Sequence, residues 1–244
     1  MINIIMSFRN NTHITVLNES FKKKVKLGKK KSIIEVSDSW NDDELTHIIL
    51  WANDGFIKND LHHFDLKDTK NIKLKQIHER QWGNRMARTF NNQNWTTKVG
   101  EGLVYRILKK ICENTKYTVN NINTGKLRPD FEVSNLCYVE VKTFAWTSTG
   151  TANEKIVTAP IKYSELLNKK PLLIVLIAKQ AIDKWGKLLI DNDIDFKSDG
   201  FSFINDFKKL FIKHGVKYIS IKTLCNIKNI IEFKNNLNYK SKYL

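Results

Sequence analysis

The chain has 244 residues, of which 41% are hydrophobic, so it can bury a substantial core as one large domain or as a core with a smaller attachment. Its 41 basic and 25 acidic residues leave a net charge of +16, with an isoelectric point of about 9.6. This charge indicates a polyanionic partner but does not separate DNA from RNA. No segment approaches the roughly 20 apolar residues of a membrane span, and the first six residues lack the basic start and long apolar region of a secretion leader, so we expect a soluble, intracellular (cytoplasmic) protein with no membrane partner.

The three cysteines, Cys112, Cys137 and Cys225, lie in apolar segments and have no metal-binding or redox spacing. We expect them to be small core residues in a reducing compartment.

Residues 1–95 are predicted to form an N-terminal α+β extension. Residues 1–16 and 24–36 contain strand-like segments, whereas residues 41–51 have helical spacing and a capping box that begins at Asn41. Such a region could act as a DNA-recognition module, although no helix-turn-helix or zinc-finger pattern can be named.

Two basic clusters precede the predicted main domain. Lysines concentrate in residues 22–31, and Arg80, Arg85 and Arg88 form a second cluster with Trp82. Either cluster could contact phosphates, and Arg85 and Arg88 are our DNA-binding candidates. The alternative is an ordinary solvated face.

Residues 100–112 are predicted to form an amphipathic helix, because apolar residues recur there at 3.6 residues per turn. Glu101 flanks this apolar stripe. A glutamate at the start of a helix is favoured by the helix dipole whatever its function. The other interpretation makes Glu101 a supporting ligand of an active site.

Two consecutive predicted strands, residues 128–133 and 136–143, carry Pro129-Asp130 and Glu140-Val141-Lys142. Strand alternation puts Glu140 and Lys142 on one face. A three-residue connection would set Asp130 opposite Glu140, whereas a two-residue connection would turn Asp130 to the other face. The acidic side chains require the first register or a bulge to meet.

Asp130, Glu140 and Lys142 are the residue types that phosphodiester hydrolysis needs. A hard cation screens the phosphate charge, and Mg²⁺ prefers a few carboxylate oxygens while it keeps some of its waters. A lysine ammonium beside the attacking water favours its hydroxide form. Acid-x-Lys is frequent in this lysine-rich chain, but this copy lies in an apolar strand, one hairpin after the chain's only Pro-Asp. The alternative is a turn-initiating Pro-Asp followed by a half-exposed strand with a charge pair.

The order of these elements resembles the core of the PD-(D/E)xK nuclease superfamily. The matching part is roughly the middle third of the chain: the helix with Glu101, a strand at residues 117–121, the two motif strands, a helix, and an apolar strand at 172–178. The resemblance implies a restriction-endonuclease-like α/β core over residues 96–234, with a mixed central sheet flanked by helices. It also implies that Asp130, Glu140 and the Val141 backbone carbonyl hold Mg²⁺, with Mn²⁺ as a substitute, and that Lys142 assists the attacking water.

The polar segment 148–155 is similar to the loop that follows the catalytic strand in some type II restriction endonucleases. Its candidate DNA-binding residues are Ser148, Thr149, Asn153 and Lys155. The segment also fits a helix start, because Thr151 and Glu154 have capping-box spacing and Pro160 suits the first turn of the following helix. The two roles can coexist.

The C-terminal part continues the α/β pattern. Residues 201–214 are predicted to form a helix that Gly215 ends, and residues 216–221 a strand. Residues 235–244 are predicted to be a basic tail.

We therefore expect a Mg²⁺-dependent, sequence-specific endonuclease of type II restriction type that cuts double-stranded DNA and, as the resemblance implies, inverts at phosphorus and leaves 5′-phosphates. We expect a homodimer, since two copies related by a two-fold axis most simply cut both strands of a symmetric site. A methyltransferase acting on the same site would be a further partner. Two alternatives stay open: a structure-selective or repair nuclease, such as a junction resolvase, and a non-catalytic basic DNA-binding protein.

Overall fold

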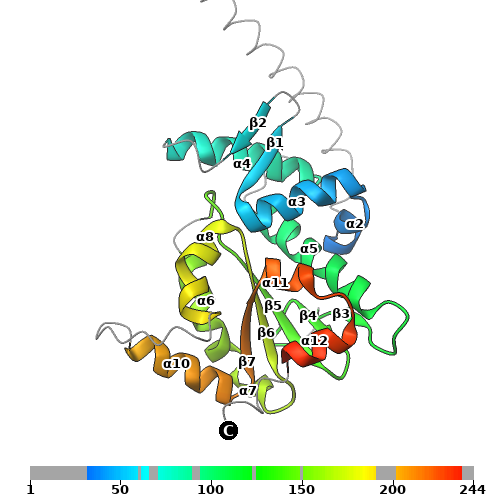
Figure 1. Cartoon of the computed structure of the whole chain (residues 1–244), viewed down its shortest axis with the longest axis vertical. Coiled ribbons are helices and arrows are strands. Elements are labelled where there is room, and N and C mark those ends of the chain that lie inside the picture. Colours follow the sequence, from blue (N-terminus) through cyan, green and yellow to red (C-terminus); the bar gives the residue numbers. More distant parts are fainter. Residues whose placement is uncertain are drawn as a thin grey trace, which may run out of the picture.

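The computed structural model describes residues 32–59, 62–65, 71–89, 94–122, 125–148, 151–190 and 202–237. A five-stranded mixed sheet lies between helices, and further helices and a two-stranded hairpin precede it in the chain (Figure 1). The predicted mixed α/β class is confirmed. None of the helices in these ranges is both long enough and apolar enough to cross a bilayer.

The sheet has the strand order β3-β4-β5-β6-β7. The pairs β3–β4 and β4–β5 are antiparallel, whereas β5–β6 and β6–β7 are parallel, and helices make the crossovers that parallel pairs require. The unbroken aliphatic run of β6 suits a strand that is buried on both faces. The strands are β3 (Val119–Asn121), β4 (Phe131–Val133), β5 (Cys137–Thr143), β6 (Leu172–Ile177) and β7 (Val216–Ser220).

The N-terminal helices begin at capping boxes. The box of Asn41 and Glu44, which was predicted, starts α3 (Asp42–Asp54) and is confirmed. A second box starts α2 (Ile33–Asp38), so the strand-like prediction for residues 24–36 is wrong in the described part. Residues 1–16 and the lysines of residues 22–31 lie outside the described residues. A hairpin of β1 (Phe56–Asn59) and β2 (His62–Asp65) then leads to α4 (Ile72–Met86).

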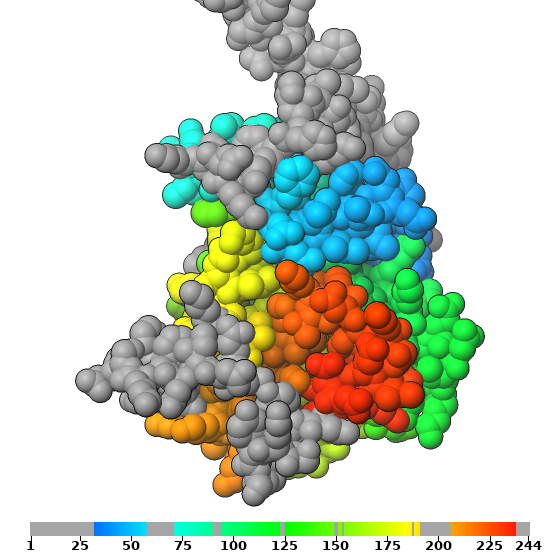
Figure 2. Space-filling model, in the orientation of Figure 1, coloured from blue at the N-terminus to red at the C-terminus, as the bar shows by residue number. Residues whose placement is uncertain are grey.

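The two faces of the sheet bury separate apolar clusters. On one face, Val139 and Val175 belong to a cluster that also contains Trp51 of α3 and Trp82 of α4. On the other face, side chains such as Ile174 pack with α6 and α10. In Figure 2 the surface of α3 meets that of α11, in agreement with the packing of these two helices. The helices before residue 95 are therefore part of the same core as the sheet.

Helix α5 (Trp95–Cys112) packs directly against the end of β5. A Cβ added to Gly100 would lie 2.3 Å from Thr143 Oγ1, so only a glycine allows this approach. The helix begins earlier than predicted, which puts Glu101 in its second turn. The explanation of Glu101 as an ordinary first-turn acid is therefore wrong.

Helix α6 (Thr151–Lys162) contains Pro160 in its last turn, so the prediction that Pro160 starts the following helix is wrong. Proline has no N–H, and the Ile156 carbonyl therefore lacks its usual helical donor. The Tyr218 hydroxyl of β7 donates to this carbonyl at 2.8 Å. The proline is tolerated because a side chain from the sheet replaces the missing hydrogen bond.

The remaining helices complete the layers around the sheet. The predicted helix and strand at residues 201–221 are confirmed as α10 and β7. The predicted tail is wrong over residues 235–237, which belong to α12, and residues 238–244 lie outside the described part. Cys112 and Cys137 are buried as expected, and Cys225 is half-buried. The helices not yet located are α7 (Ser164–Leu167), α8 (Lys179–Ala181), the π-helix η1 (Ile182–Gly186), α9 (Lys187–Leu189), α10 (Ser202–Lys213), α11 (Ile221–Asn226) and α12 (Ile230–Leu237).

Candidate active site

The β4–β5 hairpin sets Asp130 opposite Glu140. Phe131 pairs with Val139, so three residues, 134–136, connect the strands. This is the longer of the two connections considered from the sequence, and it gives the register that the site requires. One step further along the same register, Asp130 faces Glu140.

Where the backbone pairing of β4 with β5 ends, the carboxylate of Asp130 provides the next hydrogen-bond acceptor for β5. Its Oδ2 accepts a hydrogen bond from the Val141 amide at 2.7 Å. The amides of Tyr138 and Phe144 donate to the opposite, β6 side. Because the N–H and C=O of one strand residue point to the same neighbour, the Val141 carbonyl is directed toward the Asp130 side. A carboxylate and a backbone carbonyl, both candidate cation ligands, thus share one edge of β5.

Glu140 is held through both of its oxygens. It is 3% exposed; Oε1 accepts from the Lys142 ammonium and Oε2 lies 2.9 Å from the Tyr163 hydroxyl. Burial raises the pKa of Tyr163, so the hydroxyl keeps the proton that it donates. The same hydroxyl lies 3.0 Å from the Arg128 carbonyl and accepts from Lys162 at 2.6 Å. Tyr163 was not identified from the sequence, where no local pattern connects it to the motif.

Glu101 contributes a third carboxylate from α5. Burial, followed by the negative charges of Asp130 and Glu140, raises the pKa of Glu101 to about 9. Burial and then Glu140 raise the pKa of Asp130 to about 7, although the Val141 amide and Lys142 oppose this rise. Carboxyl groups that are packed this closely retain protons when no cation compensates their charge. A cation bound among these carboxyl groups would lower their pKa values.

The donor set fits a hard cation with few protein ligands. Mg²⁺ takes one or two carboxylates and keeps several waters, and each carboxylate oxygen has a lone pair beyond the hydrogen bond that it already accepts. Among the residues with described side chains, no three His, Cys, Asp or Glu groups form a ready-made metal cage. Asp130, Glu140 and the Val141 carbonyl therefore suit Mg²⁺ or Mn²⁺ better than a structural zinc ion.

Asp130, Val141 and Lys142 line a polar cleft of about 380 Å³, whereas Glu140 is not among its lining residues. Its walls come from α4, α5, the end of β5, the loop after β5 and the first turns of α6. Three basic side chains face it, together with hydroxyl groups and the carboxylates of Glu101 and Asp130. The lining residues are Arg80, Asn94, Trp95, Thr96, Thr97, Glu101, Asp130, Val141, Lys142, Thr143, Thr147, Ser148, Thr151, Ala152 and Lys155.

Two of the DNA-binding candidates after β5, Ser148 and Lys155, line this cleft. The Ser148 hydroxyl also accepts a hydrogen bond from the Ala145 amide at 2.9 Å. Thr149 and the side chain of Asn153 lie outside the described part of the chain. Residue 151 begins α6, so the segment starts a helix, and it also borders the cleft. The capping box of Thr151 and Glu154 and the DNA contact stay predictions.

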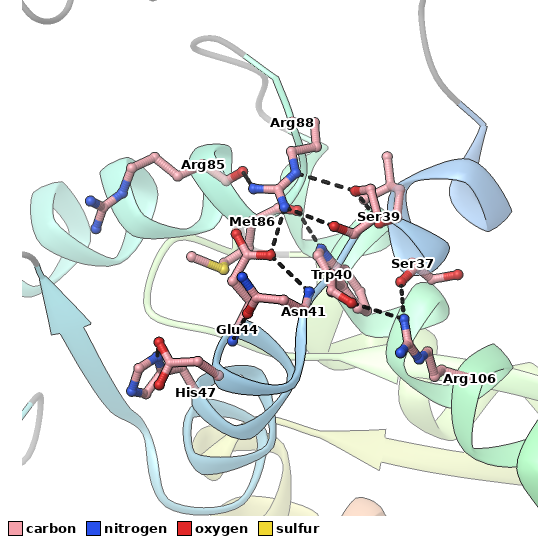
Figure 3. Close-up of polar contacts among 12 residues, drawn as sticks. Ser37, Ser39, Trp40, Asn41, Glu44, His47, Arg85, Met86, Arg88 and Arg106 are labelled. Carbon is pink, nitrogen blue, oxygen red and sulfur yellow. Dashed lines mark hydrogen bonds and ion pairs between the residues drawn. The ribbon is translucent and has the colours of Figure 1, made fainter.

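The other two DNA-binding candidates, Arg85 and Arg88, do not line the cleft. Arg88 follows α4 in a left-handed conformation with a φ of 51°, and its guanidinium donates to Glu44 at 2.6 Å and to the Ser39 hydroxyl and carbonyl at 3.2 Å (Figure 3). These bonds tie the C-terminal end of α4 to α3 and to the segment between α2 and α3, while Arg85 is directed away from them in the same view. A structural role accounts for Arg88, and DNA contact by either arginine stays a prediction.

Comparison with protein-family models, with curated proteins and with solved structures gives no significant match. The resemblance to PD-(D/E)xK nucleases therefore rests on the motif residues, on the hairpin register that sets Asp130 opposite Glu140, and on the element order α5-β3-β4-β5-α6-β6.

Proposed function

We propose that this protein is a Mg²⁺-dependent endonuclease that hydrolyses phosphodiesters of double-stranded DNA in the cleft beside β5. The observation that carries the proposal is the meeting of Asp130 with Glu140, Val141 and Lys142 across one hairpin. The groups that this hydrolysis needs are two carboxylates, a backbone carbonyl directed toward them and an ammonium.

Each group has a separate role. Asp130, Glu140 and the Val141 carbonyl would hold Mg²⁺, which when bound supplies positive charge to the phosphate. The Lys142 ammonium orients the attacking water and stabilises the charge that develops on it. The Tyr163 hydroxyl donates to Glu140 Oε2 and so fixes the orientation of this carboxylate.

The lining of the cleft favours a polyanionic substrate. Arg80 and Lys155 add positive charge beside Lys142, and the surrounding threonine and serine hydroxyls can donate to phosphate oxygens. The net charge of +16 attracts nucleic acid over a longer range. We extend the proposal to a restriction-type enzyme that acts as a homodimer on a specific sequence, leaves 5′-phosphates and has a cognate methyltransferase.

Separate assays of binding and cleavage test the proposal. Asp130→Ala and Lys142→Ala should each reduce Mg²⁺-dependent cleavage by at least about a thousandfold, the loss expected when a catalytic group is removed. DNA binding in Ca²⁺ should stay within a fewfold of wild type. Matched controls are Asp206→Ala and Lys213→Ala, which remove the same charges from exposed positions of α10 outside the cleft.

The alternatives predict different results in the same assays. Undiminished cleavage by the Asp130 or Lys142 variant would overturn the assignment of the site. Cleavage of branched DNA but not of linear duplex would indicate a structure-selective nuclease. Binding without cleavage in Mg²⁺ or Mn²⁺ would indicate a non-catalytic DNA-binding protein.

A further inference from the structure

We propose that Glu79 of α4 is a positioning residue of the cleft, which fixes the loop of residues 145–148 immediately after the motif strand. The inference rests on the proposed nuclease function and deepens it. It assigns a role in the site to a helix that precedes the nuclease-like core in the chain.

Glu79 connects two segments that lie far apart in the sequence. Its side chain is 1% exposed; Oε1 accepts from the Trp51 indole N–H at 2.9 Å, and Oε2 accepts from the Thr147 amide at 2.9 Å. Burial raises its pKa to about 7, while the donors from Trp51, Thr147 and Trp146 oppose the rise. Within the described part of the chain, Glu79 makes no ion pair. Its burial therefore depends on these donors.

Two neighbours on α4 hold the same loop. Gln76 Nε2 donates to the Trp146 carbonyl at 3.0 Å. The Lys75 ammonium lies 4.2 Å from the centre of the Trp146 ring, within the range of a cation–π interaction. Three side chains of α4, those of Lys75, Gln76 and Glu79, thus contact the consecutive loop residues Trp146 and Thr147.

The loop of residues 145–148 forms a wall of the cleft. Thr147 and Ser148 line the cleft, and the loop is closed internally, because the Ser148 amide donates to the Ala145 carbonyl at 3.0 Å. Arg80, the residue after Glu79, reaches the same cleft from α4. The contacts of Glu79 therefore fix a wall of the cleft. They also fix α4, the helix that carries Arg80 into the cleft.

Both partners of Glu79 are N–H donors. A carboxylate suits them because each of its two oxygens can accept one of these hydrogen bonds. A glutamine of the same size has one acceptor oxygen and one NH₂ group, so it can accept from one partner but must face the other with a donor. Glu79→Gln therefore breaks one of the two bonds without opening a cavity, and it leaves one N–H buried and unsatisfied.

The test compares Glu79→Gln with Glu165→Gln, which makes the same chemical change at an exposed position of α7. Glu79→Gln should raise KM for DNA about tenfold, with kcat within about threefold, and should speed hydrogen exchange of the Thr147 amide about tenfold or more relative to amides of β6. Glu165→Gln should change none of these. An unchanged KM together with unchanged Thr147 exchange would overturn the inference, as would exchange that rises equally throughout β6.

Gln76→Met is the second variant, in case Glu79→Gln does not fold. It removes only the bond to Trp146 and should raise KM about threefold; an unchanged KM would overturn the part of the inference that contacts from α4 to residues 145–148 support DNA binding. If wild-type protein binds DNA without cutting it, the nuclease proposal fails but the positioning role is still tested, because DNA affinity then replaces KM and the amide exchange is read in the same way.

Discussion

Replacing Asp130 with asparagine should stabilise the metal-free protein while it abolishes cleavage. In the folded protein Asp130 is partly buried beside Glu140, and desolvation followed by the charge of Glu140 raises its pKa from 3.8 to about 7. Asparagine has nearly the same shape, carries no charge, and can still accept the hydrogen bond from the Val141 amide. The substitution therefore removes the desolvation of a charge and its repulsion by Glu140, and it retains the local geometry.

The size of the effect follows from proton linkage. Between pH 3.8 and about 7 the folded state holds a proton that the unfolded state releases, so this group lowers the free energy of unfolding as the pH rises. At 1.36 kcal/mol per pKa unit, the full cost above pH 7 is at most about 4 kcal/mol. A hydrogen bond to a neutral acceptor is about 1 kcal/mol weaker than one to a charged acceptor. We expect Asp130→Asn to raise the free energy of unfolding by about 1–3 kcal/mol at pH 8.

Urea denaturation in EDTA, at pH 8 and at pH 5, measures this difference. The stabilisation should be largest at pH 8 and should shrink at pH 5, where the wild-type carboxyl is protonated when folded. Adding Mg²⁺ at pH 8 should stabilise the wild type but not the variant, since a ligand that binds only the folded state shifts the equilibrium by mass action. An Asp130→Asn protein that is no more stable than wild type at pH 8 in EDTA would refute this account of the carboxylate cluster.

Three further substitutions test the packing and the cleft. Gly100→Ala places a Cβ 2.3 Å from Thr143 Oγ1 and should cost about 1–3 kcal/mol of stability in urea denaturation; a neutral result would contradict the close approach of α5 to β5. Tyr218→Phe leaves the Ile156 carbonyl without a donor and should cost about 1–3 kcal/mol by the same method, whereas a change below about 0.5 kcal/mol would mean that another group satisfies the carbonyl. Arg80→Ala should weaken DNA binding and reduce the slope of log K against log salt by about 1; an unchanged slope would remove Arg80 from the phosphate contacts.

The hairpin was predictable from the sequence because its determinants are local. Alternation along β5 assigns Glu140 and Lys142 to one face, and three connecting residues, 134–136, set Asp130 opposite them. The sequence pattern left two registers open, and the structure has the one that assembles the site. The residues that decide this geometry are close together in the sequence, so strand alternation and the length of the connection relate them directly.

The groups that support the site were not predictable, because each depends on a contact between distant segments. Tyr163 reaches Glu140 across 23 residues, and the Thr147 amide reaches Glu79 across 68. The basic cluster that contains Arg88 suggests DNA contact, but in the fold the carboxylate of Glu44 lies 2.6 Å from the Arg88 guanidinium. Charge and periodicity predict which residues are polar or buried, but the tertiary arrangement decides which of them meet.

The most direct test of the central claim is to incubate wild-type protein and Lys142→Ala with unmethylated phage-length duplex DNA and Mg²⁺, separate the products on a gel, and sequence the ends. The account predicts discrete fragments with 5′-phosphate ends from the wild type and intact DNA from the variant. Wild-type protein that binds this DNA but leaves it intact in both Mg²⁺ and Mn²⁺, or a variant that cuts as fast as wild type, would contradict it.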